Sequence, residues 1–166
     1  MRGTMRGAAL FVSGLIVGGG VMATVAAQSM DRGLRLNHVG ISVPNFQETV
    51  DFYEKVMGYR VSHRFPPNPD GRPSTAFVQI SRDTFIEIAP AAADVKPAIT
   101  HIGVWAADAA ATVARVKQNG ASPTEPRRSE NSGSILANIT DPAGIRTEIN
   151  QQPPDSLMSK AIDSWK

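Results

Sequence analysis

The sequence predicts an α+β fold in which one unit, a strand followed by a helix and three further strands, occurs twice in tandem. The run LNHVGISV, which contains His38, recurs as ITHIGVWA, which contains His101. Each copy closes on a strand-like run with a central glutamate, Glu87 in FIEI and Glu148 in RTEI. Such a repeat, with a period near sixty residues, indicates that one structural unit is duplicated.

The elements of the first half follow in order from residue 34. Alternating apolar and polar residues predict a strand over 34–43, and PNFQETVDFYEKVMG predicts a helix with Asn45 as its N-cap and Glu48 completing a capping box. Gly58 ends this helix. Its predicted apolar stripe consists of Phe46, Val50, Tyr53 and Met57. The remaining segments are a strand at 59–65, a proline-rich surface loop at 66–74 and a hairpin of strands at 75–81 and 84–89.

The second half repeats this order after a linker at 91–97. A strand at 98–106 leads to a helix with Asp108 as its N-cap and a stop at Asn119-Gly120. Residues 121–134 are either a weak strand or a long loop. Strands at 135–140 and 145–150 flank the DPAG turn. The tail could form a short helix with Leu157, Ala161 and Trp165 on one face, which has no counterpart in the first half.

The first 27 residues are typical of a signal peptide. Arg2 and Arg6 precede an uncharged apolar run that ends in small residues, with Val25 and Ala27 at the positions a signal peptidase reads. We therefore expect export to the periplasm or medium, with an uncleaved membrane anchor as the alternative. The expected organisation is a leader (1–27), an extension (28–33), a domain (34–150, with modules 34–90 and 97–150) and a C-terminal tail (151–166).

Composition excludes several classes of function. Without Arg2 and Arg6 the chain carries 15 basic and 15 acidic residues, so no basic surface for nucleic acid is expected. The absence of cysteine excludes a thiol nucleophile, a thiolate metal site and disulfide bonds. We expect a small-molecule substrate and no stable membrane partner unless the leader is retained.

The two histidines and two glutamates are the candidate metal ligands. Because strand side chains alternate between faces, each of His38, Glu87, His101 and Glu148 points away from an aliphatic face, and all four could face one cavity. A glutamate within a buried strand is costly unless it is paired or metal-bound. Two imidazoles and two carboxylates suit a divalent cation such as Zn²⁺, Ni²⁺, Co²⁺, Mn²⁺ or Fe²⁺.

Alternation also predicts other residues of the same concave face. His63, which has no counterpart in the other half and precedes a loop, is expected at the surface, with a position at the mouth of the site as the alternative. Arg146 could hold an anionic group of a substrate, although a solvated or ion-paired arginine is equally consistent with the sequence. The remaining candidates for contact with substrate are Gln79, Trp105 and Asn138, with Phe77 and Asn150 on the same face.

The chain resembles the vicinal oxygen chelate superfamily, which includes glyoxalase I, methylmalonyl-CoA epimerase, extradiol dioxygenases and antibiotic-resistance proteins. The resemblance covers residues 34–150 and is carried by LNHVGISVPNFQETVDFYEKVMGYRV, FIEIAP, THIGVWAAD, VARVKQNGA and DPAGIRTEI. It implies two βαβββ modules whose curved sheets form a partly open barrel around a metal site. It also implies that His38, Glu87, His101 and Glu148 bind the metal, as in glyoxalase I-like members.

The activity implied by this resemblance is that of a metal-dependent lyase or isomerase. Such an enzyme chelates adjacent oxygens of a small carbonyl or hydroxy compound and stabilises an enediolate-like intermediate, and Glu148, with Glu87 as its counterpart, would move the proton. Ala91 stands where glyoxalase I enzymes carry a polar residue, so the substrate is left unassigned. The alternatives are an extradiol-type dioxygenase with Fe²⁺ on His38, His101 and Glu148, and a non-catalytic binding protein. A homodimer is one expected assembly, with each site built from one chain or from two.

Overall fold

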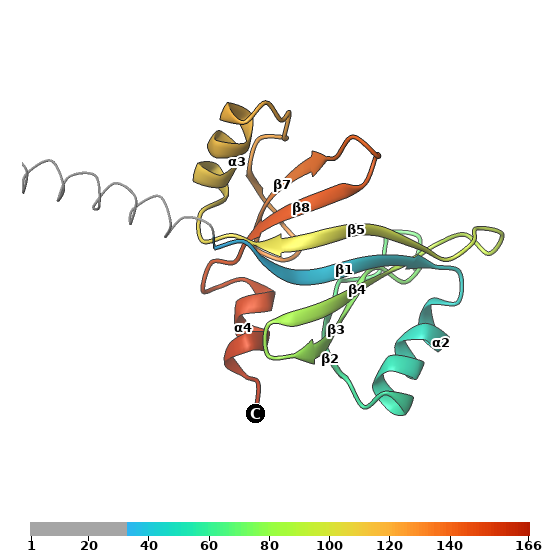
Figure 1. The fold of residues 1–166 in the computed structure, drawn as a ribbon. Helices are drawn as coiled ribbons and strands as arrows, with labels where there is room; N and C mark the ends of the chain where they lie inside the picture. The colour runs from blue at the N-terminus through green and yellow to red at the C-terminus, as the bar shows by residue number, and fades with distance from the viewer. Residues whose placement is uncertain (1–32) are drawn as a thin grey trace, which may run out of the picture. The chain divides into compact units, whose positions relative to one another are not determined.

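The structure is a computed structural model that describes residues 33–166; the predicted leader and most of the predicted extension lie outside the described residues. Residues 34–166 form one compact unit. It contains one mixed sheet of eight strands in the order β2-β3-β4-β1-β5-β8-β7-β6, which curves without closing (Figure 1). The predicted α+β class and the partly open barrel are confirmed. Among the described residues, no helix is long and apolar enough to cross a membrane.

The two halves of the sheet have the same topology and join through their first strands. The first half comprises β1 (Arg35–Val43), β2 (Arg60–Arg64), β3 (Ala76–Ser81) and β4 (Thr84–Pro90), and the second comprises β5 (Ala98–Trp105), β6 (Arg127–Arg128), β7 (Ile135–Thr140) and β8 (Arg146–Gln151). In each half the first strand pairs in parallel with the last, β1 with β4 and β5 with β8. Strands β1 and β5 pair antiparallel at the centre, so the repeat produces an approximately two-fold arrangement.

The first helical segment differs from the sequence expectation. It consists of α2 (Phe46–Asp51) followed by a turn of π-helix, η1 (Phe52–Val56). Asn45 precedes α2, but its side chain makes no capping hydrogen bond, so the predicted capping box with Glu48 is wrong. Met57, predicted to be buried, is 46% exposed, because the wider π turn shifts the residues that follow it. Tyr59 packs against this core and stacks on Tyr53.

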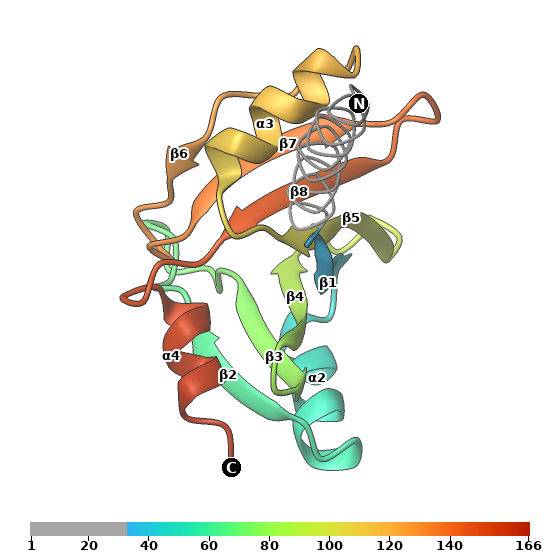
Figure 2. The same cartoon turned by 60° about the vertical axis from the view of Figure 1, so that its left-hand side comes forward.

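The second helix follows the prediction. Helix α3 (Ala109–Gln118) begins after Asp108, whose carboxylate accepts a hydrogen bond from the backbone N–H of Ala111, and Gly120 has a positive φ where the helix ends. Helix α3 packs on β7 and β8, whereas α2 packs on β4 (Figure 2). These helices bury the aliphatic face of the sheet and leave the opposite, concave face for the polar residues.

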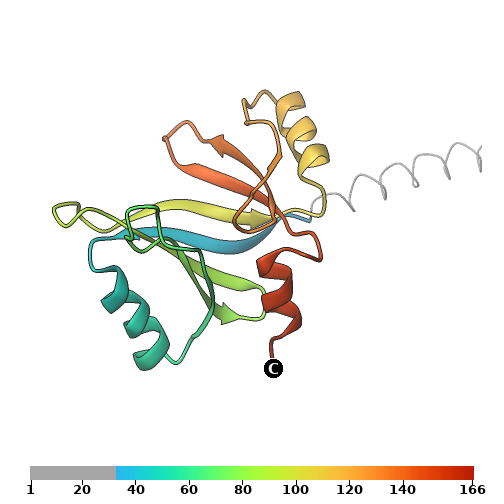
Figure 3. The ribbon, with the colours of Figure 1, turned by 180° about the vertical axis from the view of Figure 1, so that it is seen from behind.

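The C-terminal segment forms α4 (Leu157–Asp163), which lies beside the strands of the first half (Figure 3). Its buried residues are Met158 and Ala161, which pack against Phe77 and Phe85. The buried face therefore differs from the predicted one, since Trp165 is 37% exposed. Because cross-strand neighbours share a face of a sheet, Phe77 and Phe85 lie on the same face as Glu87 and His38, and α4 covers part of the concave face.

Candidate metal centre

The four predicted ligands lie in two rows that cross the four central strands. In one row, His38 of β1 is followed by Gly103 of β5 and Glu148 of β8. In the adjacent row, Glu87 of β4 is followed by Gly40 of β1 and His101 of β5. Each row therefore contains one histidine, one glycine and one glutamate, and neighbouring rows on one face lie close enough for the side chains to meet.

The side chains of both rows converge on one point. The Nε2 atoms of His38 and His101 are 2.9 Å apart. An oxygen of Glu87 lies 3.4 Å from His38 Nε2 and 3.3 Å from His101 Nε2, and an oxygen of Glu148 lies 3.6 Å from His38 Nε2. Donors bound to one divalent cation at about 2.1 Å are roughly 3.0–3.4 Å from each other. The donor atoms of His38, His101 and Glu148 all lie within 4.8 Å of one another, so these three residues of one chain fit a divalent cation, and Glu87 lies beside both imidazoles.

The glycines of the repeat make this convergence possible. A Cβ added to Gly40 would lie 2.0 Å from Cε1 of His101, and one added to Gly103 would lie 2.0 Å from Cε1 of His38. Each imidazole therefore occupies the space above the glycine of the opposite strand. The pattern His-x-Gly, present in both halves of the sequence, was the available signal for this packing.

A polar residue precedes each histidine and contacts its Nδ1 atom. Asn37 Oδ1 lies 2.9 Å from His38 Nδ1, and Thr100 Oγ1 lies 3.0 Å from His101 Nδ1. A hydrogen bond from Nδ1–H to such an oxygen leaves the lone pair on Nε2, the atom at the centre of the site. Asn37 reaches this position because the β1–β5 register shifts between Leu36 and His38, as a β-bulge can re-aim a side chain.

His101 has a second neighbour at the same nitrogen. Arg146 Nη2 lies 2.7 Å from His101 Nδ1, and Arg146 Nη1 donates to Asn138 Oδ1 at 2.9 Å. A guanidinium can only donate, so it favours the tautomer of His101 whose proton is on Nε2. Binding of a cation at Nε2 requires the other tautomer, in which Thr100 rather than Arg146 is the partner of Nδ1.

Burial dominates the electrostatics of the site. It lowers the pKa of His38 to about 4 and, together with the negative charge of Glu87, raises the pKa of Glu148. Burial also acts to raise the pKa of Glu87, but the neighbouring His101 and His38 outweigh it and hold that pKa below its usual value. A protonated imidazole is therefore disfavoured at His38, as a metal ligand requires.

His63 lies on the concave face, which agrees with the alternative expectation of a position at the site and not with the expected surface position. Its register with Phe77, and that of Phe77 with Glu87, place His63 at the end of the second row, on the concave face. The ring stacks on Phe77 at 4.6 Å between centroids, and burial lowers its pKa to about 4. Ser62 Oγ lies 3.0 Å from Nδ1, while the buried Nε2 has no hydrogen-bond partner among residues 33–166. Ser62 thus contacts the Nδ1 atom of the histidine that follows it, as Asn37 and Thr100 do.

The residues predicted to contact substrate lie in three different parts of the structure. Arg146 and Asn138 line a hollow of about 440 Å³ that also includes Glu148. Gln79 shares the concave face by register, but it is fully buried beneath α4, where it contacts Arg60 and the carbonyl oxygen of Ala161. Its predicted contact with substrate is therefore wrong, because the C-terminal helix covers this part of the face.

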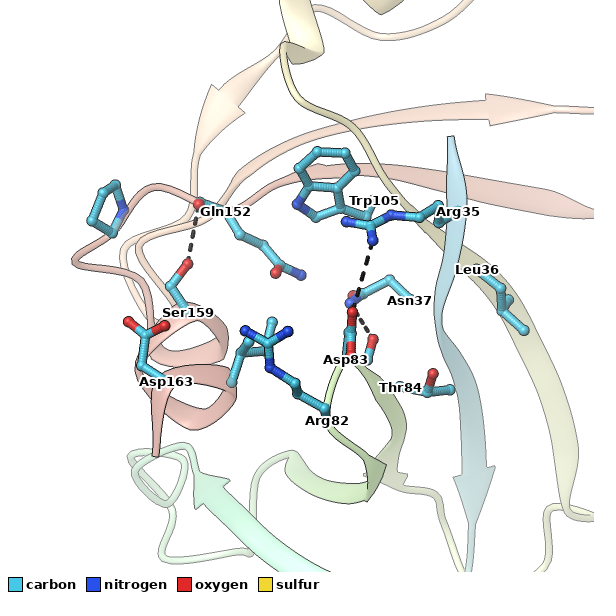
Figure 4. Close-up of a pocket in the computed structure, with 12 residues that line it drawn as sticks. Arg35, Leu36, Asn37, Arg82, Asp83, Thr84, Trp105, Gln152, Ser159 and Asp163 are labelled. Carbon is cyan, nitrogen blue, oxygen red and sulfur yellow. Dashed lines mark hydrogen bonds and ion pairs between the residues drawn. The ribbon is translucent and has the colours of Figure 1, made fainter. Parts of the chain in front are cut away.

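Trp105 lies apart from the hollow that contains Glu148. It lines a second hollow of about 400 Å³ with Asn37, Arg82 and other residues, and the guanidinium of Arg35 lies 4.4 Å above its ring (Figure 4). Asp83 pairs with Arg35 at 3.8 Å and accepts a hydrogen bond from Asn37 through its backbone oxygen. Trp105 is thus part of a structural cluster at the start of β1.

Comparison with known proteins is consistent with this geometry. The family model described as "Glyoxalase/Bleomycin resistance protein/Dioxygenase superfamily" matches residues 35–149. The chain belongs to this superfamily.

Its relatives include curated enzymes and solved structures. A lactoylglutathione lyase of Salmonella typhimurium is 31% identical over 70% of this chain and 91% of the relative, and that of Escherichia coli O157:H7 is 28% identical over 72% and 93%. The structure of methylmalonyl-CoA epimerase from Mycobacterium tuberculosis aligns with a TM-score of 0.61 at 21% identity, over 72% of this chain and 88% of that one. That last similarity shows the shared fold.

Proposed function

We propose that the chain is a metal-dependent lyase or isomerase of the glyoxalase type, acting on a small carbonyl or hydroxy compound with two adjacent oxygens. The observation that carries this proposal is the convergence of His38, His101 and Glu148, whose donor atoms all lie within 4.8 Å of one another, with an oxygen of Glu87 3.3–3.4 Å from both imidazoles. The relatives named lactoylglutathione lyase support the same class of reaction.

The residues of the chain have distinct roles in this proposal. The two imidazoles and the two carboxylates would hold the cation, which supplies Lewis-acid polarisation of the substrate oxygens when it is bound. Glu148 lines the hollow of about 440 Å³ and so faces the space that a substrate would fill. We assign to Glu148 the transfer of a proton between adjacent carbons of the substrate, with Glu87 as the opposing carboxylate.

Metal content and turnover test the proposal together. The full-length chain is purified without chelators, offered Ni²⁺, Zn²⁺, Co²⁺ or Mn²⁺, and analysed for bound metal. Stoichiometric metal is expected for the wild type and should be lost in His101→Ala, while Arg82→Gln, a variant of an exposed arginine on the β3–β4 turn, should retain it. Failure of the wild type to take up any of these metals contradicts the proposal.

Turnover assays then distinguish a lyase from a non-catalytic binding protein. Disappearance of the hemithioacetal of methylglyoxal and glutathione would assign lactoylglutathione lyase activity, and a Glu148→Gln variant should lose turnover while still binding metal. Stoichiometric metal without turnover on any hydroxycarbonyl compound would support a non-catalytic binding protein instead.

A second candidate function is an extradiol-type dioxygenase. It is favoured by His63, whose buried Nε2 lies on the concave face without a hydrogen-bond partner in the described part of the chain and could serve as the additional acid–base group which that chemistry requires. The ligands would be His38, His101 and Glu148, with Fe²⁺ as the cation. Consumption of oxygen by the Fe²⁺-loaded chain in the presence of catechol would establish this function in place of the first.

We also propose that residues 1–27 direct export. The proposal rests on the arginines, the apolar run and the small residues of the sequence itself. N-terminal sequencing of the protein recovered from a bacterial periplasm should begin at Gln28, whereas a chain that begins at residue 1 in the membrane fraction would indicate an uncleaved anchor.

A further inference from the structure

Three arginines line the hollow beside Glu148. It has a volume of about 440 Å³, and Arg127, Arg128 and Arg146 all line it. The acidic residues that line it are Glu125 and Glu148. Because Glu148 belongs to both the hollow and the candidate metal centre, the hollow adjoins that centre.

The strand register places two of these arginines on the face that carries the ligands. Arg127 of β6 pairs with Leu136 of β7, which in turn pairs with Asn150 of β8. Arg146 and Glu148 lie four and two residues, respectively, before Asn150 on β8, so side chains at these positions point to the same face as Asn150. Arg127 and Arg146 therefore flank Glu148 on the concave face.

Neither of these two arginines forms a close ion pair with a carboxylate of residues 33–166, although the positive charge of Arg146 acts to lower the pKa of Glu87 and of Glu148. Within residues 33–166, Arg128 pairs with Asp155 and Glu125 pairs with Lys117. The hydrogen-bond partners of Arg146 are Asn138 Oδ1 and His101 Nδ1, and neither belongs to a carboxylate. Arg127 is exposed and has no ion pair or hydrogen bond within the described part of the chain.

With a divalent cation bound, the site would carry excess positive charge. A divalent cation would balance the two negative charges of Glu87 and Glu148, leaving the two positive charges of Arg127 and Arg146 without a counterpart. Binding of the cation by His101 Nε2 also places the proton on Nδ1, so that Arg146 loses one of its two acceptors and can turn toward the hollow. Guanidinium groups bind carboxylates and phosphates through paired hydrogen bonds.

We propose that this hollow binds an anionic group of the substrate, a carboxylate or a phosphate, through Arg127 and Arg146, while two adjacent oxygens of the same molecule reach the metal centre. This inference rests on the proposed function and narrows it. The substrate class is then a small hydroxycarbonyl compound that carries a separate carboxylate or phosphate.

Chelating hydroxamates test the inference because they present two adjacent oxygens and do not react with arginine. The full-length, Ni²⁺-loaded chain is titrated calorimetrically with acetohydroxamate, succinic monohydroxamate, its methyl ester and phosphonoacetohydroxamate. At least one anionic probe should bind about tenfold or more tightly than the neutral ones, since hydrogen bonds to charged groups are among the stronger ones. The carboxylate and phosphonate probes show which anion is preferred.

Variants identify the groups that produce the preference. Arg127→Gln should bring the affinity for the anionic probe close to that for the methyl ester without changing that for acetohydroxamate, and Arg82→Gln should leave both unchanged. Arg146→Gln should have the same effect as Arg127→Gln, with bound Ni²⁺ measured in parallel. Equal binding of charged and neutral probes, or a preference that survives in Arg127→Gln, overturns the inference. Loss of all binding, acetohydroxamate included, would instead contradict the proposed metal centre.

Discussion

Gly40 lies opposite His101 in the antiparallel pairing of β1 and β5, and the imidazole of His101 occupies the space that a side chain at position 40 would fill. The symmetry of the repeat gives Gly103 the same relationship to His38. The duplicated His-x-Gly pattern therefore packs the two halves together, because the glycine of each half makes room for the histidine of the other. Both imidazoles can reach the centre of the sheet only because neither glycine has a side chain.

Substitution of this glycine should disturb the metal site more than the fold. In Gly40→Ala the new Cβ would lie 2.0 Å from Cε1 of His101 and must turn the imidazole away. We expect the affinity for Ni²⁺ or Zn²⁺ to fall at least about tenfold, as found when groups that orient metal ligands are changed. Metal titration measures the effect, and circular dichroism checks the fold. Gly33→Ala is the control, because an added Cβ there meets nothing within 4 Å; wild-type affinity in Gly40→Ala would contradict the packing described.

His63 should make the stability of the protein sensitive to mild acid. Burial holds its pKa at about 4, below its ordinary value of 6.5. Between these values the unfolded chain binds a proton on His63 that the folded chain does not, so the free energy of unfolding falls as the pH is lowered from about 6.5 to 4. In His63→Gln this contribution, up to about 3 kcal/mol, should be absent.

Urea unfolding between pH 7.5 and 4.5 measures the difference. Both chains are kept in excess chelator, because metal binding is itself pH-dependent. The stability of the wild type should fall more steeply with acid than that of His63→Gln. Parallel profiles for the two proteins would show that the ring is solvated in the folded chain.

Helix α4 should contribute to the stability of the domain through Met158. This side chain is 2% exposed and packs against Phe77 and Phe85 on the concave face. Met158→Ala should therefore lower the free energy of unfolding by about 2–5 kcal/mol. Leu157→Ala, which changes a half-buried neighbour in the same helix, should have less than half this effect in urea unfolding. Comparable losses in the two variants would indicate that α4 is held mainly by its backbone contacts.

The sequence predicted those features of the fold and site that depend on local pattern. Alternation placed His38 and Glu87 on the face opposite the aliphatic residues, and the repeat supplied their partners. The misplacement of Gln79 has a tertiary cause: its face was assigned correctly, but α4, from outside the repeat, covers it. Likewise, no local pattern distinguishes the buried ring of His63 from a solvated one.

The polar residues that contact the histidines follow a pattern in the sequence, but the expected alternation of strand side chains hid its meaning. Asn37, Ser62 and Thr100 each precede a histidine, and regular alternation would direct such neighbours to opposite faces of a strand. Each instead contacts the Nδ1 atom of the histidine that follows it. The recurrence of a polar residue before all three histidines was visible, but its meaning required the local geometry of the strands. Arg127 was not predicted because β6 is only two residues long.

The partner of His101 Nδ1 should decide whether that histidine can bind a metal. Both Thr100 and Arg146 contact this nitrogen, and only the hydroxyl can accept a hydrogen bond from it. Thr100→Val preserves the shape of the side chain but leaves Arg146 alone at Nδ1, which favours the tautomer with its proton on Nε2. The affinity for Zn²⁺ should then fall about 10–100-fold in a metal titration, whereas Thr100→Ser should retain it. Ser62→Ala removes the equivalent hydroxyl at a histidine outside the proposed ligand set and should leave metal binding unchanged. If Thr100→Val binds the metal as tightly as Thr100→Ser, the orientation of His101 is fixed by Gly40 and by the strand pairing rather than by its hydrogen bond.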